Sequence, residues 1–143
     1  MAKLKIYEIL QLANSQNTKD EIVQVLLRHQ SHGLKQVLQG AFDDAIVWLL
    51  PEGAPPFRNM TSREGHSPTD LHRATDSFKY LVKGPGDQVK QPKREKVFLG
   101  ILESIDPKDA DVVIAMKDKK LGEMFPKLNK EVVKATWPKL IIS

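Results

Sequence analysis

The stretch PKREKVFLGILESIDPKDADVVIAMKDKK, residues 92–120, decides the fold class predicted for the chain. Two apolar patterns with helical spacing follow each other in it, and a proline opens each one. Proline fits the first helical turn, because the N–H that it lacks has no partner there. Asp106 stands directly before the second proline, where an aspartate caps a helix by accepting a backbone N–H. The stretch therefore predicts two consecutive helices that meet near Asp106.

Helical signals continue on both sides of this stretch. Thr18 and Glu21 have the spacing of a capping box. Gly33 is expected to close the helix that follows them. Ser67 stands before a proline as an N-cap does, and Asn129 is expected to cap the last helix. The predicted fold class is all-α: a single compact domain of about six to eight helices that spans the whole chain.

The segment GAFDDAIVWLL, residues 40–50, has two interpretations. Ala41, Ala45 and Trp48 recur at helical spacing, which favours a helix with Trp48 as a core anchor. The run AIVWLL is alternatively a short buried strand. The helix is the preferred prediction, because the chain holds no second strongly β-like run with which a strand would pair.

Residues 51–67, PEGAPPFRNMTSREGHS, are predicted to form a long loop. The prolines remove backbone donors and the glycines add conformational freedom. Loops of this length are typically functional or mobile. Pro55, Pro56, Phe57 and Arg58 combine a stiff backbone with an apolar tip, so they are a candidate partner-binding loop.

The composition is that of a soluble globular protein, with 41% hydrophobic and 28% charged residues. There is no cysteine, which excludes disulfides and thiol chemistry and fits a reducing compartment. No apolar run approaches the length of a membrane span, and the first residues lack a cleavable leader pattern. We therefore expect no membrane association.

Positive charge is concentrated in the second half of the chain. Residues 77–143 carry a net charge of +5 and residues 1–76 a net charge of −1, which gives +4 in total. A basic half favours an anionic partner, nucleic acid first. Free N–H groups and the positive dipole end at a helix start suit a phosphate, although ordinary solvation of helix surfaces explains lysines equally well. The candidate DNA contacts are Lys90, Lys93, Arg94, Lys96, Lys117, Lys119 and Lys120.

Little in the sequence favours catalysis. The four histidines are dispersed, and His29 and His32 lack a nearby third ligand for a metal site. Asp43 and Asp44 are adjacent, so on a helix they point in different directions and do not form an acid–base pair. The glycines near residue 84 do not form a phosphate-binding P-loop. The chain is therefore expected not to be an enzyme and to need no metal and no cofactor.

The chain resembles an uncharacterised family of small proteins from cyanophages and other marine T-even-like phages. Four segments carry the resemblance: LKIYEIL, LKQVLQGAFDDAIVWLLPEGAPPF, REKVFLGILESIDPKDADVVIAMKDKKL and VVKATWPKLI. They span nearly the full length. The resemblance implies a protein of the host cytoplasm during infection, or of the virion, and it implies no particular activity.

The order of these segments is also similar to the N-terminal helical DNA-binding domain of T-even phage ATP-dependent DNA ligases. The segments DPKDADVVIAMKDKK and ATWPKLI occupy the corresponding places, and Lys139 stands in place of the family's glycine in the ending. The nucleotidyl-transfer motif K-x-D-G does not occur in the chain. The likeness implies a non-catalytic module that grips the duplex backbone with little sequence preference. The alternative is a protein-interaction module that binds a phage or host replication or transcription factor, or a virion component.

Overall fold

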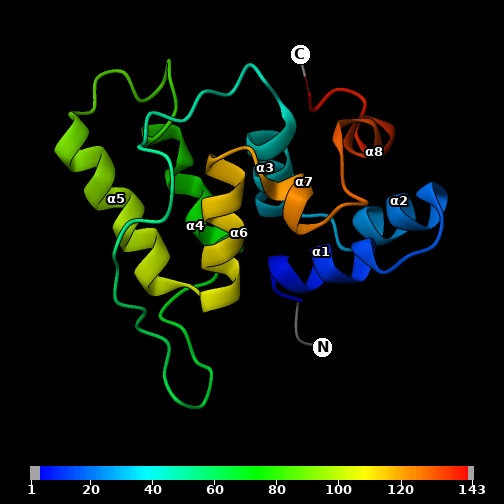
Figure 1. Ribbon diagram of the computed structural model, residues 1–143, viewed down its shortest axis with the longest axis horizontal. Coiled ribbons are helices and arrows are strands. Elements are labelled where there is room, and N and C mark those ends of the chain that lie inside the picture. The colour runs from blue at the N-terminus through cyan, green and yellow to red at the C-terminus, as the bar shows by residue number, and fades with distance from the viewer. Residues whose placement is uncertain (1–3, 142–143) are drawn as a thin grey trace.

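Helices form nearly all of the regular structure in residues 4–141, the part of the chain that the computed structural model describes (Figure 1). The elements are α1 (Ile6–Asn14), α2 (Lys19–Arg28), α3 (His32–Phe42), α4 (Leu71–Ala74), the 3-10 helix η1 (Thr75–Tyr80), α5 (Gln91–Ser104), α6 (Pro107–Lys117), α7 (Leu121–Met124) and α8 (Lys130–Thr136). The prediction of an all-α domain is confirmed.

Helix α6 occupies the centre of the fold. It packs against α1, α3, α5 and α7, and Figure 1 shows it between α5 on one side and α3 on the other. Val112, Val113 and Met116 are completely buried. Because apolar residues cover several sides of α6, it is a core helix and not a surface helix with one apolar stripe.

Three of the expected helix caps are present. The Asp106 carboxylate accepts the Lys108 N–H at 2.9 Å, and Pro107 is the first residue of α6. Thr18 accepts the Glu21 N–H at 3.2 Å. Asn129 accepts the Val132 N–H at 2.9 Å. These signals involve residues two to three positions apart, so the sequence alone carries them.

The preferred prediction of a helix through residues 43–50 is wrong. Helix α3 ends at Phe42, and Asp43 is fully buried as its C-cap. In place of the alternative strand, the segment forms only an isolated antiparallel bridge between Trp48 and Val82. Trp48 still anchors the segment, because its indole N–H donates to Gly40 O at 2.9 Å.

The helix predicted to begin after Ser67 also differs from the structure. Asp70, not Ser67, is the N-cap, and it accepts the Arg73 N–H at 3.0 Å. A single α-helical turn then passes into η1. Gly33 does not close α2 but lies in the first turn of α3, where a Cβ would come within 2.7 Å of the His72 Cα atom. This close approach of two backbones is the reason for a glycine at that position.

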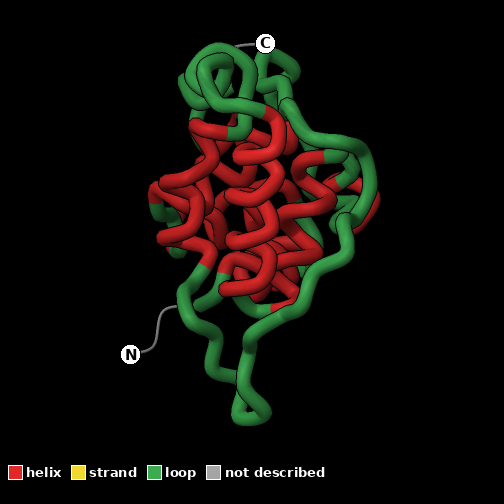
Figure 2. The backbone as a smooth tube through the Cα atoms, turned by 90° about the vertical axis from the view of Figure 1, so that its left-hand side faces the viewer, coloured by secondary structure: helices red, strands yellow, loops and turns green. Residues whose placement is uncertain are grey.

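Residues 43–70 contain no helix, and the part beyond residue 57 projects from the helical body as a loop (Figure 2). Its base supplies hydrogen bonds to the carbonyl groups at the end of α5. Asn59 Nδ2 donates to Leu102 O and Ile105 O, the Met60 N–H donates to Glu103 O, and the Thr69 N–H donates to Ser104 O. The last carbonyls of a helix have no partner within the helix, so this loop acts as a C-terminal cap of α5.

Candidate nucleic-acid interface

A compact turn sets the start of α5. Gly84 has a φ of +98°, which favours glycine, and a Cβ on Gly86 would lie 2.6 Å from Val82 O. The Arg94 guanidinium reaches back from the first turns of α5 and donates to Gly86 O at 3.2 Å and to Val89 O at 2.6 Å. It also bonds the Gln91 side chain. The turn and the helix start therefore form one hydrogen-bonded unit.

Three lysines at this helix start point into solvent. Lys90 is the N-cap residue, and Lys93 and Lys96 follow one and two turns later. Positions three apart in a helix lie on neighbouring parts of one face. All three lysines are exposed, and none forms an ion pair or hydrogen bond with its side chain among residues 4–141. They form the basic row of α5.

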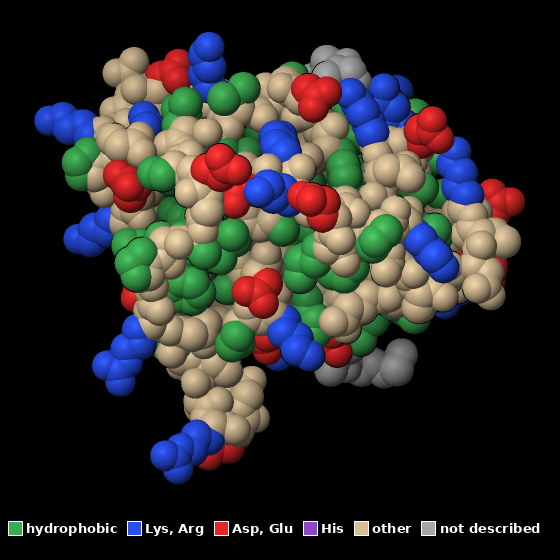
Figure 3. Space-filling view, in the orientation of Figure 1, with side chains coloured by type: hydrophobic (Ala, Val, Ile, Leu, Met, Phe, Trp, Pro, Cys, Tyr) green, Lys and Arg blue, Asp and Glu red, His purple; other side chains and the backbone are tan. Residues whose placement is uncertain are grey.

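The basic row belongs to a longer positively charged edge. Figure 3 shows Lys and Arg side chains projecting along the edge of the molecule that α5 and the long loop form. Arg58 and Arg63 on that loop are exposed as well. Two sequence segments about thirty residues apart thus add cations to one edge, because the loop base is fixed to the end of α5.

Three of the seven candidate DNA contacts use their cationic groups inside the protein and leave the candidate interface. Arg94 is only 9% exposed and holds the turn described above. Lys117 is 5% exposed, and its ammonium donates to Pro51 O at 2.8 Å and to Gly53 O at 3.1 Å beside Asp118. A buried cation that satisfies carbonyl oxygens has a structural role.

Lys119 is the third of these residues, and although it is exposed, its ammonium turns back onto the protein. Its ammonium donates to Gly40 O at 2.7 Å and to Asp43 O at 3.0 Å, so it caps the end of α3. Burial lowers the pKa of Lys119, an effect that Asp44 and Asp43 partly offset. Its φ of +60° places it where glycine usually ends a helix, which adds a backbone cost. Lys120 is exposed but lies 3.5 Å from Glu52.

The candidate partner-binding loop is less free than expected. Phe57 does not form an exposed tip, because it packs against the hydrophobic core. Pro55 is half-buried and Pro56 is exposed. Both prolines line a small apolar pocket of about 260 Å³ that the loop forms with Phe98 and neighbouring residues of α5. Of the four residues, Pro56 and Arg58 are exposed.

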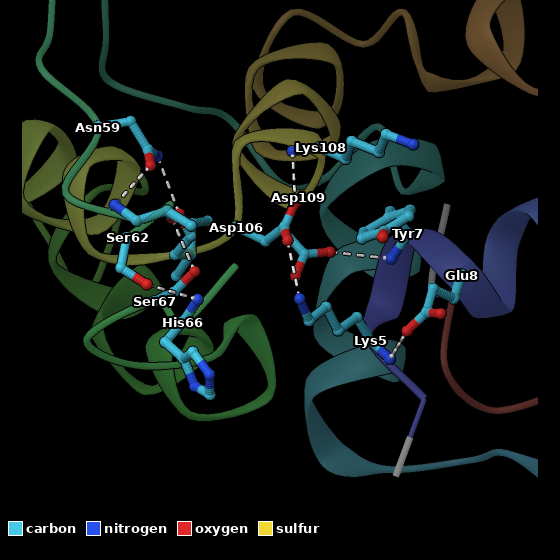
Figure 4. Close-up of polar contacts among 12 residues, drawn as sticks. Lys5, Tyr7, Glu8, Asn59, Ser62, His66, Ser67, Asp106, Lys108 and Asp109 are labelled. Carbon is cyan, nitrogen blue, oxygen red and sulfur yellow. Dashed lines mark hydrogen bonds and ion pairs between the residues drawn. The ribbon is translucent and has the colours of Figure 1, made fainter. Parts of the chain in front are cut away.

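A polar cluster that the sequence did not indicate lies at the start of α6 (Figure 4). The Lys5 ammonium donates to Asp106 at 2.8 Å, and Asp109 accepts the Tyr7 N–H at 2.9 Å. Asp109 is 1% exposed. Burial raises its pKa to about 6, although the Tyr7 N–H works against this shift. The cluster joins α1 to α6, so its contacts stabilise the fold.

Replacing Asp109 with asparagine is expected to remove a pH dependence of stability. The folded pKa of about 6 lies above the ordinary value of 3.8, so the folded state retains a proton that the unfolded state has released between these values. Stability therefore falls as pH rises through this window. Asparagine stays neutral and still accepts the Tyr7 N–H. We expect Asp109→Asn to match the wild type near pH 4 and to exceed it by about 2–3 kcal/mol at pH 7.

Urea denaturation of both proteins across this pH range measures the difference directly. Asp111→Asn is the matched control, because Asp111 is exposed on the same helix. Parallel stability curves for wild type and Asp109→Asn would show that Asp109 is ionised in both states.

Within residues 4–141, no group of three or more His, Cys, Asp or Glu side chains is arranged to hold a metal ion. None of the helices in this part of the chain is both long enough and apolar enough to cross a membrane.

The fold and the surface together define an all-α domain that presents a row of exposed lysines at a fixed helix start. The sequence places this domain in a family. The chain belongs to DUF6433, a family of unknown function, whose family model matches residues 9–123. This match covers α2 to α6 and includes the whole basic row. No curated protein matches the chain.

Proposed function

We propose that this protein binds duplex DNA through the phosphate backbone, with little sequence preference, and that the basic row of α5 carries the binding. The observation behind this proposal is the exposure of Lys90, Lys93 and Lys96 without acidic partners among residues 4–141. The likeness to the helical domain of phage DNA ligases supports a non-catalytic accessory of phage DNA metabolism.

The start of α5 attracts phosphate groups for two physical reasons. The lysines release condensed counterions when they neutralise phosphates, which favours binding at low salt. Pro92 has no N–H, but the Gln91 and Lys93 N–H groups in the first turn have no acceptor among residues 4–141, and the helix dipole is positive at that end. Neither interaction reads base edges, so the binding would be insensitive to sequence. Cations in the first turn cost helix stability, so folding alone does not account for them.

The surface next to the lysines would let a DNA backbone approach closely. Gly100 is exposed one turn after Lys96, on the same side of α5. A Cβ on Gly100 would meet no atom within 4 Å, so no contact inside the protein requires a glycine there. An exposed glycine within a helix lowers stability relative to alanine. A smooth face beside the basic row is consistent with a backbone partner.

Gly100→Ala is therefore expected to stabilise the protein by about 0.5–1 kcal/mol. The reason is that alanine restricts the unfolded chain more than glycine does and meets no steric conflict in α5. Thermal unfolding measures the effect. Gly33→Ala is the contrasting control, because its Cβ would clash with the His72 backbone and should lower stability. A destabilised Gly100→Ala protein would show that α5 needs glycine for its own geometry.

Amide chemical shifts in the ¹⁵N-labelled protein test the location of binding. Addition of a short random-sequence duplex should shift residues 90–100 first, while residues of α2 and α8 stay unchanged. Two different duplex sequences should shift the same amides to the same extent. Shifts confined to other helices, or shifts with only one of the two sequences, would overturn the proposal.

A protein partner at the proline-rich segment is the second candidate. The pocket of about 260 Å³ beside Pro55 and Pro56 is the observation that favours it. A contact of this apolar kind would persist at salt concentrations that abolish phosphate binding. Salt dependence therefore separates the two functions.

A further inference from the structure

A cleft of about 570 Å³ lies between α3, η1 and the bridged segment around Trp48. Its size is within the range of small-ligand sites. It does not include the basic row, and neither the family nor the proposed DNA binding assigns it a role. Its lining combines an aromatic floor, two side-chain amides and one charge of each sign.

The floor of the cleft is rigid. The Trp48 indole N–H donates to Gly40 O at 2.9 Å, and Phe78 meets the ring edge-on at a centroid distance of 5.3 Å. The backbone beside Trp48 pairs with the segment around Val82, through Leu49 N to Leu81 O at 2.8 Å. A Cβ on Gly40 would come within 2.6 Å of the indole. Trp48 is thus fixed on several sides before any ligand arrives, which lowers the entropic cost of stacking on it.

One wall offers unused amide groups. Gln36 and Gln39 lie three residues apart on α3 and both line the cleft. Gln36 is half-buried, and its side chain makes no hydrogen bond within residues 4–141. Gln39 donates to Leu140 O at 3.1 Å, which leaves its carbonyl oxygen as an acceptor. A glutamine amide matches the paired donor and acceptor on the edge of a purine base.

The opposite wall carries the charges. Asp76 and Lys79 lie three residues apart in η1, and a 3-10 helix has three residues per turn, so they lie on one side of it. Both side chains are exposed, and neither forms an ion pair within residues 4–141. A carboxylate can accept from ribose hydroxyls, and an ammonium can bind a phosphate.

We infer that this cleft binds a purine nucleotide. The base stacks on Trp48, its edge bonds Gln36 and Gln39, and Lys79 holds the phosphate. An apolar peptide side chain would fill the same space less well, because it would cover the two amides without bonding them. The inference does not depend on duplex binding, since it concerns a different surface and a free nucleotide.

Fluorescence of Trp48 tests the inference. The Trp137→Phe protein leaves Trp48 as the sole tryptophan, because the chain has two. AMP and adenosine should each cause a saturable change in emission, and ribose 5-phosphate should cause none. Absence of a saturable change with AMP and adenosine would overturn the inference, as would an equal response to ribose 5-phosphate.

Two further variants, each made in the Trp137→Phe protein, assign the contacts. Gln36→Met keeps the size of the side chain and should weaken both AMP and adenosine about tenfold, since it removes a hydrogen bond to the base. Gln11→Met is the matched control on the exposed side of α1 and should have no effect. Lys79→Met should weaken AMP but not adenosine. Equal affinities for Gln36→Met and Gln11→Met would contradict the assigned site.

Discussion

Replacing both Lys93 and Lys96 with glutamate is expected to weaken duplex binding at least about fiftyfold at about 0.1 M salt. Each phosphate contact on duplex DNA adds close to one unit to the slope of log affinity against log salt concentration. Losing two contacts therefore lowers the affinity by nearly two powers of ten at about 0.1 M salt. Repulsion between the new carboxylates and phosphate adds to the loss. Anisotropy of a labelled random-sequence duplex measures it.

Stability separates this effect from unfolding. Lys93 is the third residue of α5, where a carboxylate interacts favourably with the helix dipole. The double variant should therefore unfold at the same temperature as the wild type or at a higher one. A matched variant changes Lys19 and Lys134 to glutamate, because both lysines are exposed and lie on α2 and α8, at the far end of the molecule from α5 (Figure 1). Equal loss of binding in both double variants would show that only net charge matters.

Asn59→Ala is expected to destabilise the protein by about 2–3 kcal/mol. The Asn59 side chain donates to Leu102 O at 3.2 Å and to Ile105 O at 2.9 Å, and it accepts the Thr61 N–H at 2.9 Å. Alanine leaves these partly buried groups without their partner. Each such loss costs about 1 kcal/mol or more. Urea denaturation measures the change in free energy of unfolding.

The control for Asn59 is Asn17→Ala. Asn17 is exposed in the turn between α1 and α2, and its side chain makes no hydrogen bond within residues 4–141. This variant should stay within about 0.5 kcal/mol of the wild type. If Asn59→Ala were equally mild, the long loop would not be the cap of α5 that its hydrogen bonds indicate.

The helices with strong local signals could be predicted from the sequence. Asp106 with Pro107, Thr18 with Glu21, and Asn129 each set a helix start through neighbours in the chain. The end of α3 could not be predicted in this way. Lys119 caps it from a position 76 residues away from Asp43, and no local pattern contains such a contact.

The basic residues show the same division between local and tertiary information. Lys90, Lys93 and Arg94 are close in sequence, yet only Arg94 is buried. Its spacing from the apolar Phe98 and Ile101 places it on the core side of α5, and this signal was present in the sequence. No sequence pattern around Lys119 indicates that its side chain bonds the protein, because its ammonium reaches the carbonyl groups at the end of α3. The residues that line the cleft beside Trp48 come from three separate segments, so only the fold brings them together.

The last described residues of the chain pack back on the helical body. Ile141 is 6% exposed, and Leu140 packs against the core. Residues 142–143 lie outside the described residues.

The salt dependence of duplex binding tests the central claim most directly. Anisotropy of intact and nicked random-sequence duplexes is measured with the wild-type protein across a salt series. Three lysine–phosphate contacts predict that the logarithm of the affinity falls linearly with the logarithm of salt concentration, with a slope of about −2.7. Binding that is absent at the lowest salt, or that does not change with salt, would contradict a phosphate-gripping role for α5.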